Sequence, residues 1–455
     1  MAKSLDAIPS DQRGPLHGIP ISVKECNNVK NCDSTAGMCQ FLHQPCQSDN
    51  LAVCTMKKFG AVPFCLTNVP QSMYSLQCSN PPYGTTGNAF NPAKETGGSS
   101  GGEGSLIGSG GSILGLGSDV GGSLRNPAAF NGIYSLKPTY GRHLSQLGNR
   151  GPTTYEQPGF RTVSGFMSSS AKALVLAWKT LLNEGDQHLA DPSISPLKWQ
   201  DDLYNPGQKK LTIGYYDTDG FFDPHPGCKR AVQEAVEKLK VKGHKLVEFH
   251  APPLETQEIY MGLMFADGFK NIKESMDKDV LVDNAMLALG VTHFILKCPD
   301  LVRRVVNCLG SLITKEYFPK PCLNGDQVMS AIHRRDQVSL EYLQEMNQLG
   351  LDLILTPASL FPAPDKECIG EMPSAVRIYT PWNVLNMPAG IAPITKVTEN
   401  DEKNMKSMPD NDMFYKFMKK KCQNSVGLPL AVQIVGRRFH EELILSLMSE
   451  LDDEL

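Results

Sequence analysis

Gly97-Gly98-Ser99-Ser100-Gly101-Gly102-Glu103-Gly104 opens a stretch that runs to Gly122 and holds 12 glycines and 6 serines in 26 residues. A composition of this kind is typical of flexible linkers. Here, however, Leu, Ile and Val recur between the glycines, at positions 106, 107, 113, 114, 116 and 120. Such a segment can bury apolar side chains while its backbone passes close to neighbouring chain. We therefore expect the stretch to lie inside a folded domain.

Short apolar runs lie on both sides of this stretch. Those at 19–24, 61–67, 211–215, 245–249, 351–356 and 428–436 predict strands, most of them bounded by Gly or Pro. The segments 171–182 and 228–242 repeat apolar residues at helical spacing and predict helices. Strands mixed with helices throughout the chain favour an α/β layered fold.

The overall composition excludes several classes of protein. The 455 residues carry 44 Lys and Arg against 48 Asp and Glu, a formal charge of −4, which leaves no basic surface typical of nucleic-acid binding. The 13 cysteines form no Cys-x-x-Cys pair, and their odd number favours free thiols in a reducing, intracellular compartment. No run of about 18 apolar residues occurs, so we expect no transmembrane segment in this chain.

A first candidate nucleophile lies at the start of the Gly-rich stretch. Gly97-Gly98-Ser99-Ser100-Gly101 matches G-x-S-x-G, the nucleophile elbow of α/β hydrolases. That motif requires a hydrophobic strand immediately before it, whereas residues 91–96 have the composition of a loop. The match alone therefore gives weak support for a nucleophile at Ser99.

A second candidate nucleophile is Ser123, which follows Gly121 and Gly122. Backbone N–H groups at flexible glycines can converge on an oxyanion, so this serine could be held beside a tetrahedral centre. The alternative is a turn closed by an ion pair between Asp119 and Arg125, and the two interpretations are compatible.

An activated serine needs a base, and no histidine stands at a recognisable spacing from either serine. Lys24 ends the predicted strand at 19–24. If its amine is desolvated there, its pKa is lowered and the neutral form can act as a base. The alternative is a lysine that extends its amine into solvent.

Several segments together resemble one known family. They are Gly14-Pro15-Leu16-His17-Gly18-Ile19-Pro20, Thr67-Asn68-Val69-Pro70-Gln71-Ser72, residues 97–125, Leu136-Lys137-Pro138-Thr139, Asn386-Met387-Pro388-Ala389-Gly390 and Asn424-Ser425-Val426-Gly427-Leu428-Pro429. This set is similar to the amidase signature family, and within it to the fatty-acid amide hydrolase branch. The resemblance implies a central twisted mixed β-sheet flanked by α-helices on both faces. It implies a single domain over 1–455, with a catalytic core of about 14–180 and 340–455.

The resemblance also implies a Lys-Ser-Ser catalytic triad at Lys24, Ser99 and Ser123, with no cofactor and no metal. In this family the nucleophile is the residue matching Ser123, and the residue matching Ser99 follows a cis peptide bond and relays a proton between Ser123 and Lys24. Ser123 would attack an amide carbonyl, and backbone N–H groups of Val120, Gly121, Gly122 and Ser123 would stabilise the oxyanion. This order reverses the one that the elbow motif favours.

The branch implies a lipid substrate. The residues matching its acyl-chain channel are Met73, Tyr74, Leu76 and Phe265, and the expected substrates are long-chain primary amides and N-acylethanolamines. The segment 294–313, within possible membrane-cap helices at about 285–320, combines apolar residues with Lys297, Arg303 and Arg304, which is typical of a lipid interface. By analogy we expect a homodimer on an endomembrane or mitochondrial membrane. The alternatives are another amidase-signature amidase, such as an amidotransferase subunit, or a lipid-binding or membrane-enzyme-associated paralogue with weak or no catalysis.

Overall fold

The structure is a computed structural model, and most of the chain is described in it. The described residues are 2–142, 148–150, 159–184, 186–207, 209–268, 270–280, 322, 324–366 and 373–452. The predicted membrane-cap segments at 285–320 and 294–313 lie outside these residues. Within them, no helix has the length and apolar character needed to cross a lipid bilayer.

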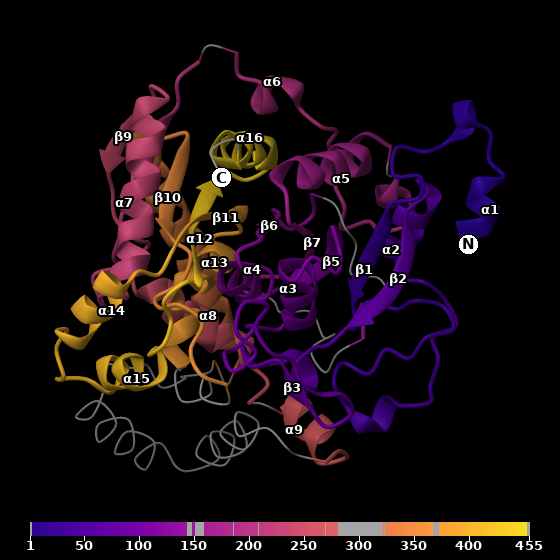
Figure 1. The fold of residues 1–455 in the computed structure, drawn as a ribbon, viewed down its shortest axis with the longest axis horizontal. Helices are drawn as coiled ribbons and strands as arrows, with labels where there is room; N and C mark the ends of the chain where they lie inside the picture. Colours follow the sequence, from indigo (N-terminus) through magenta and orange to yellow (C-terminus); the bar gives the residue numbers. More distant parts are fainter. Residues whose placement is uncertain are drawn as a thin grey trace.

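A ten-stranded mixed sheet organises the molecule, in the order β2-β1-β5-β7-β6-β11-β12-β10-β8-β9 (Figure 1). At one end β1 runs parallel to β2 and β5, and at the other β8 runs parallel to β9 and β10, while the pairings between these two groups are antiparallel. The predicted mixed sheet is thereby confirmed. Its strands are β1 (Pro20–Lys24), β2 (Val62–Thr67), β5 (Leu114–Asp119), β6 (Tyr134–Lys137), β7 (Val163–Ser168), β8 (Thr212–Tyr215), β9 (Lys245–Glu248), β10 (Leu353–Pro357), β11 (Ala389–Lys396) and β12 (Pro429–Gly436).

Helices cover both faces of the sheet, and the alternation of side chains along β12 separates them. Val432 and Ile434 belong to the apolar cluster formed with α5 (Ala171–Glu184), α7 (Pro226–Val241) and α16 (Glu441–Asp452). Ala431 and Val435 belong to clusters on the opposite face, formed with α3 (Gly101–Gly108), α4 (Arg125–Asn131), α8 (Glu255–Met264) and α13 (Thr380–Val384). In Figure 1 the central strands accordingly lie between α16 and α5 above and α3 and α8 below.

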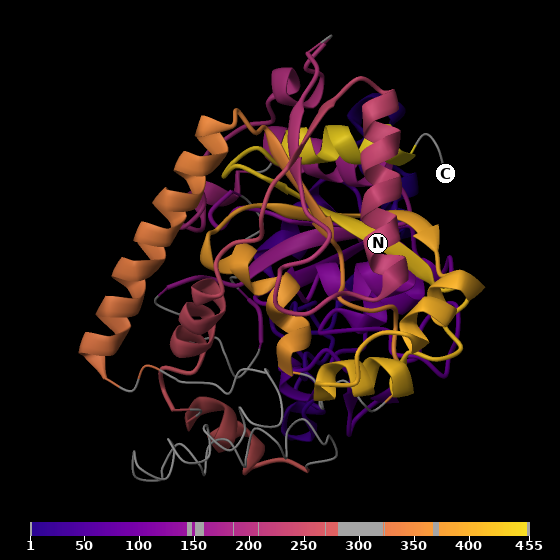
Figure 2. The same ribbon diagram turned by 90° about the vertical axis from the view of Figure 1, so that its left-hand side faces the viewer.

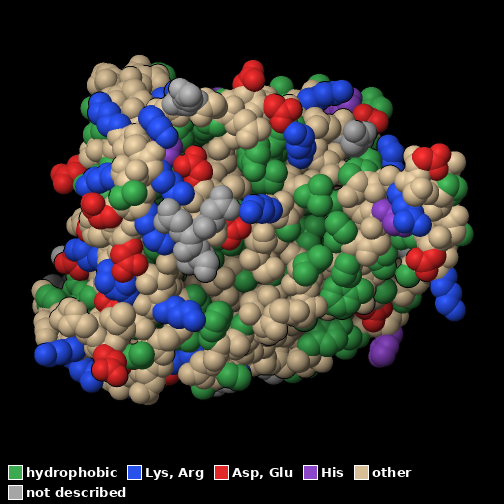
Figure 3. Space-filling model, turned by 45° about the horizontal axis from the view of Figure 1, so that its top comes forward, with side chains coloured by type: hydrophobic (Ala, Val, Ile, Leu, Met, Phe, Trp, Pro, Cys, Tyr) green, Lys and Arg blue, Asp and Glu red, His purple; other side chains and the backbone are tan. Residues whose placement is uncertain are grey.

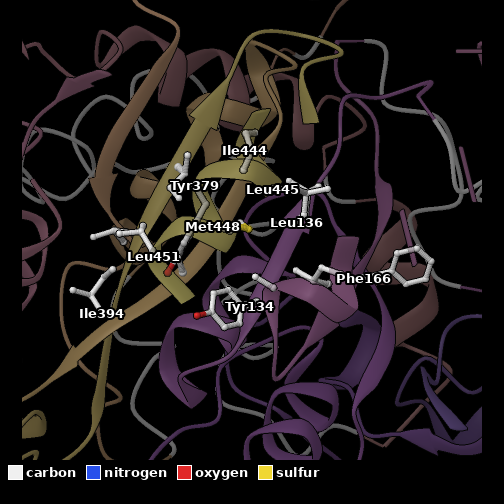
Figure 4. Close-up of a cluster of buried hydrophobic side chains, with 14 of the residues drawn as sticks. Tyr134, Leu136, Phe166, Tyr379, Ile394, Ile444, Leu445, Met448 and Leu451 are labelled. Carbon is white, nitrogen blue, oxygen red and sulfur yellow. The ribbon is translucent and has the colours of Figure 1, made fainter. Parts of the chain in front are cut away.

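Helix α16 packs closely against strands β6 and β11 of the sheet. Met448 and Leu451 of this helix lie in the same buried cluster as Tyr134 and Leu136 of β6 (Figure 4). A Cβ atom at Gly390 of β11 would lie 1.8 Å from the terminal methyl of Met448, so this side chain packs directly over the glycine.

The remaining described α-helices are short, except for α12, which extends along one side of the molecule (Figure 2). They are α1 (Ala2–Asp6), α2 (Leu51–Lys58), α6 (Asp201–Tyr204), α9 (Lys270–Met276), α12 (Gly325–Gln348), α14 (Glu399–Lys406) and α15 (Met413–Lys421). Two short strands, β3 (Ser79–Asn80) and β4 (Gly84–Thr85), form a separate hairpin. On the face drawn in Figure 3, acidic and basic side chains are interspersed, as expected from the near-balanced charge count.

Candidate active site

The site is built where three parallel strands end. Because β1, β2 and β5 run in the same direction, their carboxyl ends meet at one edge of the sheet. Lys24 is the last residue of β1 and pairs with Thr67, the last residue of β2. Ser118 and Asp119 end β5. The Gly-rich stretch therefore begins beside this edge, contributes β5 to the sheet, and ends at the same edge.

Lys24 is held inside the protein by two serine hydroxyls. Its side chain is completely buried, and its Nζ atom lies 2.8 Å from Ser99 Oγ and 2.8 Å from Ser118 Oγ. The interpretation of Lys24 as a solvent-directed lysine is therefore wrong. Ser118, which the sequence analysis did not single out, is the second partner of the amine.

Burial controls the protonation of this lysine. Desolvation lowers the pKa of Lys24 from its ordinary value of 10.5, and nearby acidic groups, among them Asp119 and Glu103, oppose the shift only in part. A neutral amine that accepts a hydrogen bond from a serine hydroxyl can take up its proton. The neighbouring thiol of Cys26 has a raised pKa because it is buried, so it stays protonated beside the amine.

Ser99 precedes α3 and is nearly buried. The peptide bond between Gly98 and Ser99 is cis, which confirms the geometry implied by the resemblance. The residues before it form only isolated bridges and no strand, so the segment is not a nucleophile elbow. Glycine is required in α3 because a Cβ atom at Gly102 would lie 2.3 Å from the backbone nitrogen of Asn68.

Ser123 lies on the loop between β5 and α4, which we call the catalytic loop (residues 120–123). Its carbonyl oxygen accepts a hydrogen bond of 3.1 Å from the N–H of Ser100, so its backbone is held beside the residue that follows Ser99. Ser123 retains 8% exposure. Lys24 and Ser99 thus share a direct side-chain hydrogen bond, and Ser123 joins the same assembly through its backbone.

Asp119 determines the shape of the catalytic loop. Its carboxylate accepts hydrogen bonds from the N–H groups of Gly122 at 2.9 Å and Leu124 at 3.1 Å. It also accepts two hydrogen bonds from Arg125, at 3.0 and 2.9 Å, so the predicted ion pair is present. Burial alone would raise the pKa of Asp119, but the charge and hydrogen bonds of Arg125 hold it well below its ordinary value. The loop is therefore organised around a buried carboxylate that stays ionised.

The hydrogen bond between Gly122 and Asp119 limits which backbone N–H groups of the loop can bind another acceptor. The N–H of Gly122 is already bonded to Asp119. In the described part of the chain, the N–H groups of Val120, Gly121 and Ser123 have no hydrogen-bond acceptor. These three groups are therefore the ones that remain available to an oxyanion.

Arg125 connects the loop to the C-terminal part of the sheet. It is completely buried, and it donates to the Tyr379 carbonyl and the Gln433 side chain at 2.9 Å each and to the Asn383 side chain at 2.7 Å. Asn383 in turn donates to Asp119 at 3.0 Å. A buried ion pair of this kind depends on having every donor and acceptor satisfied.

A second buried carboxyl, that of Glu103, lies behind the lysine. It accepts hydrogen bonds of 2.6 Å from the hydroxyls of Ser22 in β1 and Thr67 in β2. Burial raises the pKa of Glu103 to about 7, although both hydrogen bonds and the charge of Lys24 act in the opposite direction. This group therefore titrates close to neutral pH.

Of the four predicted channel residues, Leu76 lies beside the segment that carries Ser99, and Tyr74 and Phe265 lie beside each other. Tyr74 and Phe265 have ring centroids 6.2 Å apart, and the Tyr74 hydroxyl contacts the sulfur of Met264 at 3.5 Å. A Cβ atom at Gly98 would lie 3.1 Å from the Cα of Leu76, so Leu76 passes directly beside the cis peptide. Met73 is half-buried in the turn before Tyr74.

Within the described residues, no three His, Cys, Asp or Glu side chains gather in a way that could hold a metal ion. This edge of the sheet carries the amine of Lys24, the hydroxyls of Ser99, Ser118 and Ser123, and the free N–H groups of the catalytic loop. This set can deprotonate a serine hydroxyl and stabilise a negative charge that develops beside it.

Both the sequence and the fold are similar to those of known amidases. A family model described as Amidase matches residues 1–445. Fatty acid amide hydrolase 1 of Caenorhabditis elegans is 34% identical, with 98% of this chain and 78% of that protein covered, and fatty-acid amide hydrolase 1 of Sus scrofa is 36% identical, with 97% and 76% covered. A solved structure of a fatty acid amide hydrolase superimposes with a TM-score of 0.81 at 28% identity, covering 97% of this chain and 73% of that one.

Proposed function

The chain belongs to the amidase signature family, and from this premise we propose that it hydrolyses the amide bond of long-chain fatty-acid amides. Two relatives are named as fatty-acid amide hydrolases. Within that substrate class we propose primary amides and N-acylethanolamines. The reaction uses Lys24, Ser99 and Ser123 as a triad within a single catalytic domain, and it forms an acyl-Ser123 intermediate.

The observation that carries the proposal is the environment of Lys24. A completely buried lysine whose amine contacts two serine hydroxyls at 2.8 Å is expensive to keep charged, so it serves as a base and not as a surface charge. Perturbed pKa values of this kind are typical of catalytic groups.

The proposed reaction begins with proton transfer away from the nucleophile. Ser99 passes its proton to the neutral amine of Lys24 and accepts the proton of Ser123, whose Oγ attacks the amide carbonyl carbon. Negative charge develops on the carbonyl oxygen, and the available N–H groups of Val120, Gly121 and Ser123 stabilise it. Because Gly122 already donates to Asp119, we assign it to shaping the loop and not to binding the oxyanion.

Departure of the amine completes the first half of the reaction. An amine leaves only after its nitrogen is protonated, and Ser99 supplies that proton while Lys24 returns its own to Ser99. Water then attacks the acyl-Ser123 ester while its proton passes through Ser99 to Lys24. The proton returns through Ser99 to Ser123 Oγ as the ester bond breaks, which releases the fatty acid and restores the free serine.

We also propose that Tyr74 and Phe265, whose rings contact each other, line the channel for the acyl chain, and that the protein contacts membranes peripherally and forms a homodimer. The membrane contact is assigned to 294–313, outside the described residues, on the basis of its apolar and basic side chains. Flotation with anionic vesicles, before and after Arg303→Glu and Arg304→Glu, tests the contact, and light scattering tests the dimer.

The central test is hydrolysis of a C18 primary amide by the purified protein and by two variants. We expect turnover by the wild type, no turnover by Ser123→Ala, and a loss for Lys24→Ala that is strongest at neutral pH. A fluorophosphonate probe should label the wild type at Ser123. A folded wild type that neither hydrolyses the amide nor reacts with the probe would favour a lipid-binding role, and turnover of short amides alone would favour another amidase.

A further inference from the structure

Tyr260 lies on the face of α8 that is turned toward the catalytic loop. The helix places Tyr260 on the same side as Gln257, three residues earlier, and Met264, four residues later. Gln257 is hydrogen-bonded to Thr380 of α13, and Met264 contacts the hydroxyl of Tyr74. These contacts fix the orientation of the helix on both sides of Tyr260.

The Tyr260 side chain reaches the loop itself. Its ring is stacked on Phe160, with centroids 4.7 Å apart and planes at 16°. A Cβ atom at Gly121 would lie only 2.3 Å from the Tyr260 hydroxyl oxygen, so the hydroxyl rests directly against the loop backbone. A larger residue at position 121 would therefore displace the Tyr260 hydroxyl.

The hydroxyl has no protein partner among the described residues. Two other buried tyrosines of this region differ, because Tyr342 donates to the carbonyl of His250 and Tyr379 to that of Ala358. Tyr260 keeps 7% exposure, and its oxygen is not among the fully buried side-chain atoms that lack a partner, so a bound molecule can reach it. Burial also raises the pKa of Tyr260 well above its ordinary value of 10, so the group keeps its proton and is a donor.

We propose that the Tyr260 hydroxyl donates a hydrogen bond to the carbonyl oxygen of the bound amide, beside the N–H of Gly121. The inference rests on the proposed function, since it names a further substrate-contacting group of the same site. Tyr260 would add a donor from α8 to the N–H groups of Val120, Gly121 and Ser123, whereas the N–H of Gly122 is bonded to Asp119.

Tyr260→Phe tests the proposal because it removes one oxygen and keeps the stacked ring. We expect kcat/KM to fall about 10²-fold, as for the loss of one oxyanion donor, and to fall equally for a C18 primary amide and its N-(2-hydroxyethyl) analogue. The matched control is Tyr342→Phe, which removes a hydroxyl already bonded to His250. The control should lower the melting temperature and leave kcat/KM unchanged. Tyr260→Phe should lower kcat/KM and leave the melting temperature unchanged.

Two kinetic results would overturn the proposal. Wild-type kcat/KM in folded Tyr260→Phe would show that the hydroxyl does not act on the substrate. A loss confined to the N-(2-hydroxyethyl) amide would assign the hydroxyl to the leaving group and not to the carbonyl.

A binding experiment separates this inference from the proposed function. If the wild type hydrolyses neither amide, the proposed function fails, and the C18 primary amide is titrated into Ser123→Ala with and without Tyr260→Phe. An affinity about 2- to 10-fold weaker in the double variant supports the hydrogen bond, and equal affinities overturn it.

Discussion

The carboxyl of Glu103 makes the stability of the protein depend on pH in a direction opposite to that of most carboxylates. We consider Glu103→Gln, which replaces the buried carboxyl by a neutral amide of the same shape. The amide oxygen can accept from Thr67 and the amide nitrogen can donate to Ser22, whose hydroxyl lies 3.0 Å from Ser112 and can donate to it instead. The substitution therefore removes the titration and keeps the packing.

The magnitude follows from the two pKa values. Burial raises the pKa of Glu103 from 4.5 to about 7, so between these pH values the native protein holds a proton that the unfolded chain has lost. The native state is thus favoured at low pH, and the free energy of unfolding falls by about 1.4 kcal/mol for each pH unit across this interval, or about 3 kcal/mol in all. Above pH 7 the loss is complete.

Urea titrations of wild type and Glu103→Gln at pH 4.5, 6 and 8 measure this effect. We expect the difference in free energy of unfolding to shift by about 3 kcal/mol in favour of the variant between the first and the last pH. The control is Glu258→Gln, since Glu258 stands in the first turn of α8 as Glu103 does in α3, but is exposed. A difference between wild type and Glu103→Gln that stays constant over this range would refute the reasoning.

Three further predictions concern the site. The hydrolysis rate should rise with pH as Lys24 loses its proton and level off above its pKa, which burial lowers from 10.5. A rise centred near 10.5 would contradict burial of the amine. Asp119→Asn leaves the charge of Arg125 buried without its partner, so we expect thermal unfolding to show a stability loss of about 3–5 kcal/mol. The variant should also react slowly with the fluorophosphonate probe. An unchanged melting temperature would argue against the ion pair. Gly102→Ala drives a methyl group into the Asn68 backbone and should lower stability by about 1–3 kcal/mol or more, whereas Gly325→Ala, which meets no atom within 4 Å, should be tolerated.

Strands with a conventional apolar sequence were predictable, and those built on small residues were not. The six predicted strands and two predicted helices are all present, with boundaries shifted by a few residues. By contrast β5 reads Leu-Gly-Leu-Gly-Ser-Asp, and glycine has low strand propensity. Its glycines are there because a Cβ atom at Gly115 would lie 1.9 Å from the Glu103 carboxylate, a contact that only the folded structure reveals. β11 was missed because Pro393 interrupts it, at a bulge where the register shifts.

The residues of the site were identified from motifs, but their electrostatics required the three-dimensional structure. A lysine at the end of a strand is usually exposed, and the burial of Lys24 depends on α3 and β5 packing around it. Ser118 gave no signal of its own within a segment that contains 6 serines. The commitment of the Gly122 N–H to Asp119 could not be inferred from the sequence, because it depends on the conformation of the turn.

The hydrogen bonds of Arg125 have a consequence for synthesis of the protein on the ribosome. Arg125 and its partner Gln433 are 308 residues apart in the chain. At about 5–20 residues per second, translation of this interval takes roughly 15–60 s, during which the nascent chain contains Ser99 and Ser123 but lacks β12. The guanidinium cannot be satisfied inside a core before that strand emerges. We therefore expect the loop that Arg125 anchors to reach its final conformation only after β12 has been synthesised.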